Sequence, residues 1–204
     1  MEFSSVIGIV SLIAAAVFAI TGALAAAEDG LDVLGFMLFA IIVGCGGGTL
    51  RDVLLELPVF WVQAPEFLYV CIFSAVVTYI AAGYLKKLSG VLEWADAIGM
   101  ALFSVLGTIK AMDTGANSVV AITMGVMTAT FGSMIRDVIL NREPLLLKPE
   151  IYVTASLSGS VLYVLLSHLP LPANTAMLTA IVTAFVVRGG AIAFGWRLPK
   201  YRPR

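Results

Sequence analysis

A glycine-rich segment that ends in two charged residues is the part of the sequence best suited to chemistry. Its members are Gly44, Gly46, Gly47, Gly48, Thr49, Arg51 and Asp52. Each glycine in a helix interior costs about 1 kcal/mol relative to alanine, so four glycines within five residues predict a kinked or broken helix. Inside a membrane, carbonyl groups freed by a break must be satisfied by protein or by water. The segment therefore predicts a polar cavity near the middle of the membrane.

A second copy of this segment lies 85 positions later and ends in the same two charged residues. It contains Thr128, Thr130, Gly132, Ser133, Arg136 and Asp137. At the same offset Phe18 aligns with Phe103 and Gly22 with Gly107, without a gap. These matches indicate an internal duplication. Glycines in membrane helices also permit close packing, and packing is the favoured interpretation of Gly47 and Gly132 taken alone.

The two Arg-Asp pairs, 51–52 and 136–137, are charges near or within apolar segments, where such residues are usually paired or close to water. Adjacent residues on a helix point about 100° apart, so the arginine and aspartate of one pair are not expected to bond to each other. Exchange between the copies is one alternative, and a place at each mouth of a pathway is another. Interfacial anchoring at helix ends is a third. Lys110 and Arg188 are further candidates for a structural or gating role.

Seven apolar segments are long enough to be considered as membrane helices, which need about 20 residues. They cover residues 4–27, 31–55, 66–85, 91–111, 118–140, 152–169 and 173–194. The duplication gives three helices to each copy, and an odd number reverses the second copy in the membrane. We therefore expect an all-α polytopic membrane protein with one transmembrane domain over 1–204. It would comprise an inverted pair of three-helix repeats, 1–88 and 89–171, and a seventh helix with a basic tail, 172–204.

Composition supports a membrane protein and argues against other classes. Of the 204 residues 60% are hydrophobic and 12% charged, whereas soluble domains carry about 25% charged residues. The net charge of −1 gives no support for nucleic-acid binding. Cys45 and Cys71 lie in apolar runs and are interpreted as small hydrophobic residues rather than a disulfide. No catalytic or metal-binding motif is present, so neither an enzyme nor a resident cofactor is expected.

The distribution of lysine and arginine predicts the orientation. With the N-terminus outside, the inner side receives nine basic residues: Lys86, Lys87, Arg136, Arg142, Lys148, Arg197, Lys200, Arg202 and Arg204. The outer side receives Arg51 and Lys110. We therefore expect a cytoplasmic C-terminus.

The stretch GGGTLRD at 46–52, its partner GSMIRD at 132–137 and the three-plus-three-plus-one helix plan resemble a known family. They are similar to the prokaryotic TRIC channels, the trimeric intracellular cation channels. They are equally similar to bacterial inner-membrane proteins with a duplicated domain described as a glycine transporter. The resemblance covers about residues 5–195.

A TRIC-type protein implies a homotrimer in the inner membrane of a prokaryote, in contact with lipids and with one pore in each protomer. The permeant ion would be a monovalent cation, mainly K⁺, and the pore would lie between the kinked second and fifth helices. Thr49, Ser133 and the freed carbonyls would face the ion, and the two Arg-Asp pairs would shape the mouths. The alternatives are a carrier of a small neutral solute such as glycine and a structural membrane protein without transport.

Overall fold

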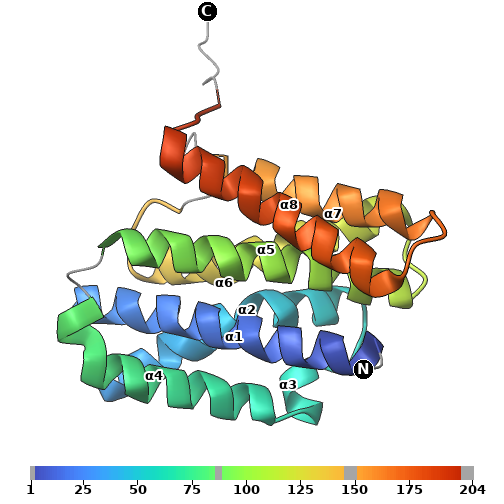
Figure 1. Cartoon of the computed structure of the whole chain (residues 1–204). Helices are drawn as coiled ribbons and strands as arrows, with labels where there is room; N and C mark the ends of the chain where they lie inside the picture. Colours follow the sequence, from blue (N-terminus) through green and yellow to red (C-terminus); the bar gives the residue numbers. More distant parts are fainter. Residues whose placement is uncertain (1–2, 86–88, 145–150, 199–204) are drawn as a thin grey trace, which may run out of the picture.

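The protein forms a bundle of helices in the part of the chain that the structure describes, residues 3–85, 89–144 and 151–198 of a computed structural model (Figure 1). The helices are α1 Phe3–Glu28, α2 Val33–Leu54, α3 Phe60–Gln63, α4 Glu66–Leu85, α5 Ser89–Asp113, α6 Ser118–Ile139, α7 Val153–Ser167 and α8 Ala173–Phe194. Seven of them fall on the predicted apolar segments, with ends that differ by a few residues. The short α3 was not predicted.

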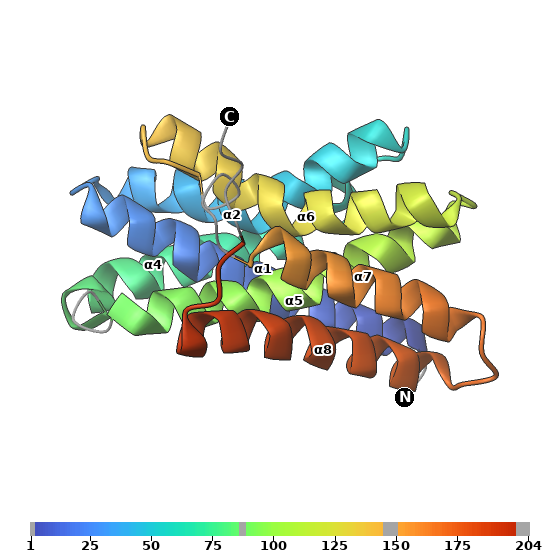
Figure 2. The same ribbon diagram turned by 90° about the horizontal axis from the view of Figure 1, so that it is seen from above.

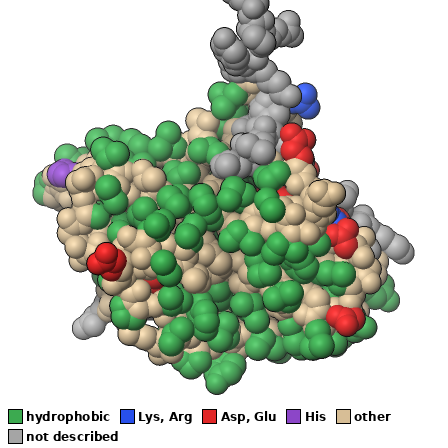
Figure 3. Space-filling model, turned by 180° about the vertical axis from the view of Figure 1, so that it is seen from behind, with side chains coloured by type: hydrophobic (Ala, Val, Ile, Leu, Met, Phe, Trp, Pro, Cys, Tyr) green, Lys and Arg blue, Asp and Glu red, His purple; other side chains and the backbone are tan. Residues whose placement is uncertain are grey.

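Among the described residues, six helices are long and apolar enough to cross a membrane: α1, α2, α4, α5, α6 and α8. The apolar α7 has 15 residues and is shorter than a typical span of about 20 residues. Many large hydrophobic side chains are exposed on the helices, among them Leu34, Phe73 and Ile80. Figure 3 shows hydrophobic side chains over most of one face of the molecule, with few charged ones. Such a surface suits contact with lipid tails, as expected for a helical membrane protein.

The core joins the two halves of the chain. α1 packs against α2, α4 and α5, and α5 packs against α6, α7 and α8. Phe18 of α1 lies against Phe103 of α5, with ring centroids 5.3 Å apart. α2 and α6 cross near the middle of the bundle (Figure 2), and their C-terminal ends lie at opposite ends of the molecule. We name these the Arg51 end and the Arg136 end.

The turns repeat at the offset of 85 residues seen in the sequence. Asp32 caps α2 by accepting a hydrogen bond from Gly35 N, and Asn117 caps α6 in the same way through Val120 N, at 2.9 and 3.0 Å. Gly30 and Gly115 both have positive φ, as do Glu56 and Asn141 after the ends of α2 and α6. The same local hydrogen bonds therefore begin and end the corresponding helices.

The basic residues that predict orientation are described only in part. Lys86, Lys87, Lys148, Lys200, Arg202 and Arg204 lie outside the described residues. Arg142 forms ion pairs with Glu28 at 2.7 Å and with Asp29 at 2.9 Å, linking the two halves at the Arg136 end. Partial burial acts to lower the pKa of Arg142, but its hydrogen bonds with the two carboxylates outweigh burial and leave the pKa raised.

Candidate functional site

The glycines of the two copies bring α2 and α6 into direct backbone contact. A Cβ at Gly47 would overlap the carbonyl oxygen of Thr128, and a Cβ at Gly132 would lie 2.5 Å from the carbonyl oxygen of Val43. Gly46 faces Gly132 more loosely, with its nearest neighbour at 3.7 Å from a Cβ. At Gly47 and Gly132 only glycine permits so close an approach, which is the packing role expected of small residues in membrane helices.

The expected interruption of the second helix is not observed. Residues 33–54 are helical throughout, as are residues 118–139 of α6. Close contact with neighbouring side chains explains the other two glycines. Gly44 leaves room for Cys71 Sγ, which would be 2.7 Å from a Cβ, and Gly48 leaves room for the Phe60 ring at the same distance. The cost of the glycines is thus offset by packing, because small residues let neighbouring groups pack close to the helix backbone.

The candidate hydroxyl groups donate to carbonyls of their own helices. Thr49 Oγ1 donates to Cys45 O at 2.8 Å, Thr128 to Met124 O at 2.6 Å and Thr130 to Val126 O at 2.9 Å. Ser133 donates to Thr130 O at 3.0 Å. Their oxygen lone pairs remain chemically able to accept a bond or contact a cation.

Arg51, Asp52 and Lys110 form one charged cluster at the Arg51 end. Arg51 Nε and Nη2 both donate to Asp52 Oδ1, at 2.9 and 2.7 Å. Lys110 Nζ, from α5, lies 3.1 Å from each oxygen of the same carboxylate. Asp52 is fully buried, whereas the Lys110 side chain is 36% exposed. One buried carboxylate therefore contacts two cations.

The pairing of neighbours corrects the sequence expectation. Arg51 bonds to Asp52, and Arg136 bonds to Asp137, with Nε–Oδ1 and Nη2–Oδ1 distances of 2.7 Å. The arginine side chain is long and flexible enough to turn back to the next residue, although the two Cβ atoms diverge. Among the described ion pairs, none joins the arginine of one Arg-Asp pair to the aspartate of the other. The two pairs lie at opposite ends of the molecule (Figure 2).

A short link after α2 covers the Arg51 cluster, and the sequence carried no signal for it. Phe60 N donates to Asp52 Oδ2 at 2.9 Å, and Trp61 Nε1 donates to Thr49 Oγ1 at 2.8 Å. The Phe60 ring lies 6.0 Å from Arg51 Cζ and 5.7 Å from Lys110 Nζ, within range of cation–π attraction. α3 is therefore fixed by contacts with side chains of α2 and α5.

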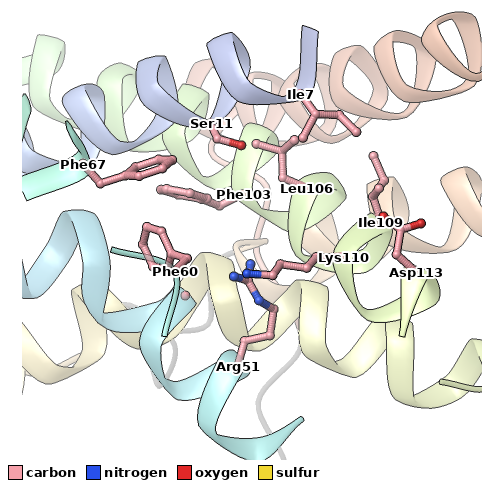
Figure 4. Close-up of a pocket in the computed structure, with 11 residues that line it drawn as sticks. Ile7, Ser11, Arg51, Phe60, Phe67, Phe103, Leu106, Ile109, Lys110 and Asp113 are labelled. Atoms are coloured by element: carbon pink, nitrogen blue, oxygen red, sulfur yellow. The ribbon is translucent and has the colours of Figure 1, made fainter. Parts of the chain in front are cut away.

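A cavity of about 320 Å³ opens beside this cluster (Figure 4). Most of its lining is apolar and comes from α1, α3, α4 and α5: Ile7, Phe60, Phe67, Phe103, Leu106 and Ile109. The polar lining consists of Ser11, Arg51, Lys110 and Asp113, with Gly48 beside them. Figure 4 shows the side chains of Arg51 and Lys110 ending together at one wall.

The second Arg-Asp pair belongs to a buried polar region at the other end. Arg136, Asp137, Asp96 and Ser133 are all almost inaccessible, and so is Tyr152 at the start of α7. Arg188 of α8 is also buried, with its Cζ 5.1 Å from the centre of the Tyr152 ring. Arg188 lines a separate cavity of about 140 Å³ with Glu93 and Arg197, so the structure does not place it at the crossing of α2 and α6.

Both halves of the chain match one known protein family. Residues 8–82 and 93–168 each match the family described as Glycine transporter. The chain belongs to this family. Each match falls within one of the two repeats expected from the sequence.

Curated relatives are membrane proteins of similar length. The inner membrane protein YadS of Escherichia coli K12, a UPF0126 protein, is 33% identical over 193 residues, covering 93% of both chains. The UPF0126 membrane protein YvgT of Bacillus subtilis is 34% identical over 202 residues, covering 97% of this chain and 95% of YvgT.

Solved structures confirm the resemblance to prokaryotic TRIC channels. The TRIC trimeric intracellular cation channel orthologue from Rhodobacter sphaeroides is 38% identical with a TM-score of 0.90. The match covers 94% of this chain and all of that one. Another TRIC cation channel is 27% identical with a TM-score of 0.88, covering 100% of this chain and 99% of that chain.

Proposed function

We propose that the protein is a channel for monovalent cations, mainly K⁺, with a pathway through each protomer. The likeness to the Rhodobacter sphaeroides TRIC orthologue, over nearly the whole of both chains, is the observation that carries this proposal. The duplicated helices would form two inverted repeats followed by α8, seven spans in all. K⁺ would be the permeant ion and not a resident cofactor.

The proposed pathway runs from the cavity at the Arg51 end past the crossing of α2 and α6. Thr128 and Gly132 lie at the crossing, where they contact the backbone of Gly47 and of Val43. Thr49 of α2 and Thr130 and Ser133 of α6 would line the same pathway. Hydroxyl and carbonyl oxygens suit a monovalent cation, because they can replace its water without a permanent charge. The tight contact at Gly47 would act as the constriction between the two ends.

Lys110 would control the mouth at the Arg51 end. Arg51 and Lys110 are both positive, so they oppose entry of a cation unless Asp52 balances them. Lys110 is the more exposed of the two, so it is the group that can move away at least cost. Its withdrawal would leave a mouth with Arg51 and Asp52 in balance, and the barrier would fall. Arg136 and Asp137 would shape the opposite mouth, and Arg188 would hold α8 against α7.

The same relatives support a proposal on assembly and location. The Rhodobacter sphaeroides protein is described as a trimeric channel, and YadS as an inner membrane protein. We propose a homotrimer in the cytoplasmic membrane of a prokaryote, in contact with lipids. The N-terminus would face outward and the C-terminus the cytoplasm, in keeping with the bias in basic residues.

Recording from the purified full-length chain in planar bilayers tests the channel. We expect discrete current steps in KCl, and a reversal potential in a KCl gradient close to that of K⁺. Gly47→Leu should strongly reduce the current, because the leucine side chain cannot fit against Thr128 O. Bilayers with the empty vesicle preparation give the baseline. Absence of steps in all preparations, or a reversal potential that follows Cl⁻, would contradict a cation channel.

A carrier of glycine is the second candidate, favoured by the description of the matching family. A carrier needs groups for both the carboxylate and the ammonium of glycine. Arg51 and Lys110 could bind the carboxylate, and Asp113 is the acidic residue that lines the same cavity. Uptake of labelled glycine into proteoliposomes that saturates with concentration, without current steps, would favour the carrier.

A further inference from the structure

We propose that the cavity at the Arg51 end binds a single-chain amphiphile that carries one negative charge, such as a saturated fatty acid. Its volume of about 320 Å³ is at the low end of small-molecule sites, typically about 300–1,000 Å³. One end is cationic and the remaining walls are mainly hydrocarbon. This inference concerns occupation of the cavity and does not depend on ions passing through it.

Positive charges outnumber negative ones in the cluster at the cationic end of the cavity. Arg51 and Lys110 contact the same Oδ1 atom of Asp52, and Phe60 N occupies Oδ2 together with Lys110. The carboxylate therefore has its oxygens already engaged, and two positive charges face one negative charge. A ligand with a single negative charge would complete the balance, which favours a monoanion over a neutral or dianionic head.

Both cations have donors to offer such a head. The Nη1 group of Arg51 and one Lys110 hydrogen are not needed by the hydrogen bonds among the described residues. A carboxylate accepts charge-assisted bonds from two donors at once, and the side chains of Arg51 and Lys110 end side by side in Figure 4. Asp113, the acidic residue in the lining, lies apart from them in this view.

The rest of the lining suits a hydrocarbon chain. Ile7 of α1, Phe67 of α4 and the α5 residues Phe103 and Leu106 form apolar walls. Burial of each methylene group against such walls favours binding. The cavity lies within one protomer and has room for one chain, so a two-chain phospholipid would not be accommodated.

Photoaffinity labelling with lauric acid that carries a photoreactive group in its chain tests the proposal. The full chain is placed in phosphatidylcholine nanodiscs, labelled in light, digested and mapped by mass spectrometry. We expect labelling of the α1, α4 and α5 peptides that line the cavity. Excess unlabelled lauric acid should abolish this labelling, and 1-dodecanol at the same concentration should leave it. Equal displacement by the alcohol, or labelling only of lipid-facing residues, would overturn the proposal.

Variants distinguish the contribution of the positive charge from that of the cavity volume to binding of the fatty acid. Lys110→Met should reduce cavity labelling about tenfold, since it removes a bond to a charged group, and Lys110→Arg should retain it. Ser11→Phe fills the cavity from α1 and keeps the charged cluster, so it should also abolish labelling. Thr123→Phe, on the exposed face of α6, is the matched control and should label as the parent protein does.

These outcomes are independent of the channel test. Current steps from a protein that lauric acid does not label would overturn this site and leave the proposed channel standing. Saturable labelling of a protein that gives no current would support this site and contradict the proposed channel. Unchanged labelling of Ser11→Phe would show that the ligand lies elsewhere.

Discussion

At the scale of single residues, Asp52 is the group on which the Arg51 end depends. It is fully buried and accepts bonds from Arg51, Lys110 and Phe60 N. Asp52→Asn would leave the buried Arg51 without its counter-charge, which costs about 3–5 kcal/mol for a buried pair. We expect a large fall in the temperature at which half of the detergent-solubilised protein is lost. Size-exclusion chromatography after heating measures this midpoint.

Asp137→Asn is the matched comparison for this prediction. Asp137 lies as close to Arg136 as Asp52 lies to Arg51. Among the described ion pairs, however, Asp137 has one cationic partner, whereas Asp52 has two. We therefore expect a smaller loss of stability than for Asp52→Asn. An equal or greater loss for Asp137→Asn would show that Lys110 and the Phe60 amide add nothing to the stability of Asp52.

The contact between α2 and α6 at Gly47 can be tested by adding one methyl group there. Gly47→Ala would drive a Cβ into the carbonyl oxygen of Thr128, and we expect a loss of about 1–3 kcal/mol from overpacking. Gly46→Ala has 3.7 Å to its nearest neighbour and should be neutral, or stabilising by up to about 1 kcal/mol. Heat inactivation of the two variants side by side measures the difference. Similar behaviour would contradict the crossing geometry.

At the scale of helices, Cys45 and Cys71 report on the packing of α2 against α4. Their sulfur atoms lie 3.7 Å apart, and the chain has no other cysteine. We expect treatment with a copper phenanthroline oxidant to join them within one chain, as two thiols lose two protons and two electrons to the oxidant. The measurement is the number of thiols that react with maleimide after denaturation, two before oxidation and none after it.

Single variants control this cross-link. Cys45→Ser and Cys71→Ser should each keep one reactive thiol after oxidation, because no intramolecular partner remains. Persistence of two thiols in the folded parent protein, under conditions that oxidise the detergent-unfolded chain, would mean that α2 and α4 do not hold the sulfurs in contact.

The positions of the long helices were predictable from the sequence, because length and hydropathy alone set the requirement for a membrane span. The state of α2 was not, since the cost of its glycines depends on partners that the sequence does not show. Packing against Thr128, Cys71 and Phe60 offsets that cost and keeps the helix continuous. α3 was also missed, because hydrogen bonds to Asp52 and Thr49 of α2 fix it, rather than a helical pattern of its own.

The candidate site was predictable in its residue types and less so in its contacts. The two Arg-Asp pairs and the paired glycines stood out because they repeat at a fixed offset. The bond between neighbours was missed, since helical geometry describes the direction of Cβ and not the reach of a flexible arginine. Lys110 joined the cluster through the fold, because 58 residues separate it from Asp52.

At the scale of the whole molecule, the repeated caps and turns support a duplication. We propose that the two copies run in opposite directions across the membrane. In that arrangement, the Arg51 end and the Arg136 end face opposite sides. The outward prediction for the Arg51 end rests on the distribution of lysine and arginine along the chain.

Single cysteines in a background with Cys45→Ala and Cys71→Ala measure this orientation. Ser118→Cys lies at the start of α6, at the Arg51 end, and Glu143→Cys lies beyond its end, at the Arg136 end; both positions are exposed. A membrane-impermeant maleimide added to intact cells should label Ser118→Cys and not Glu143→Cys, because the basic links stay in the cytoplasm. Both should react after the membrane is opened. The reverse pattern in intact cells would place Lys110 and the proposed fatty-acid cavity on the cytoplasmic side, and labelling of both would mean that the chain inserts in two orientations.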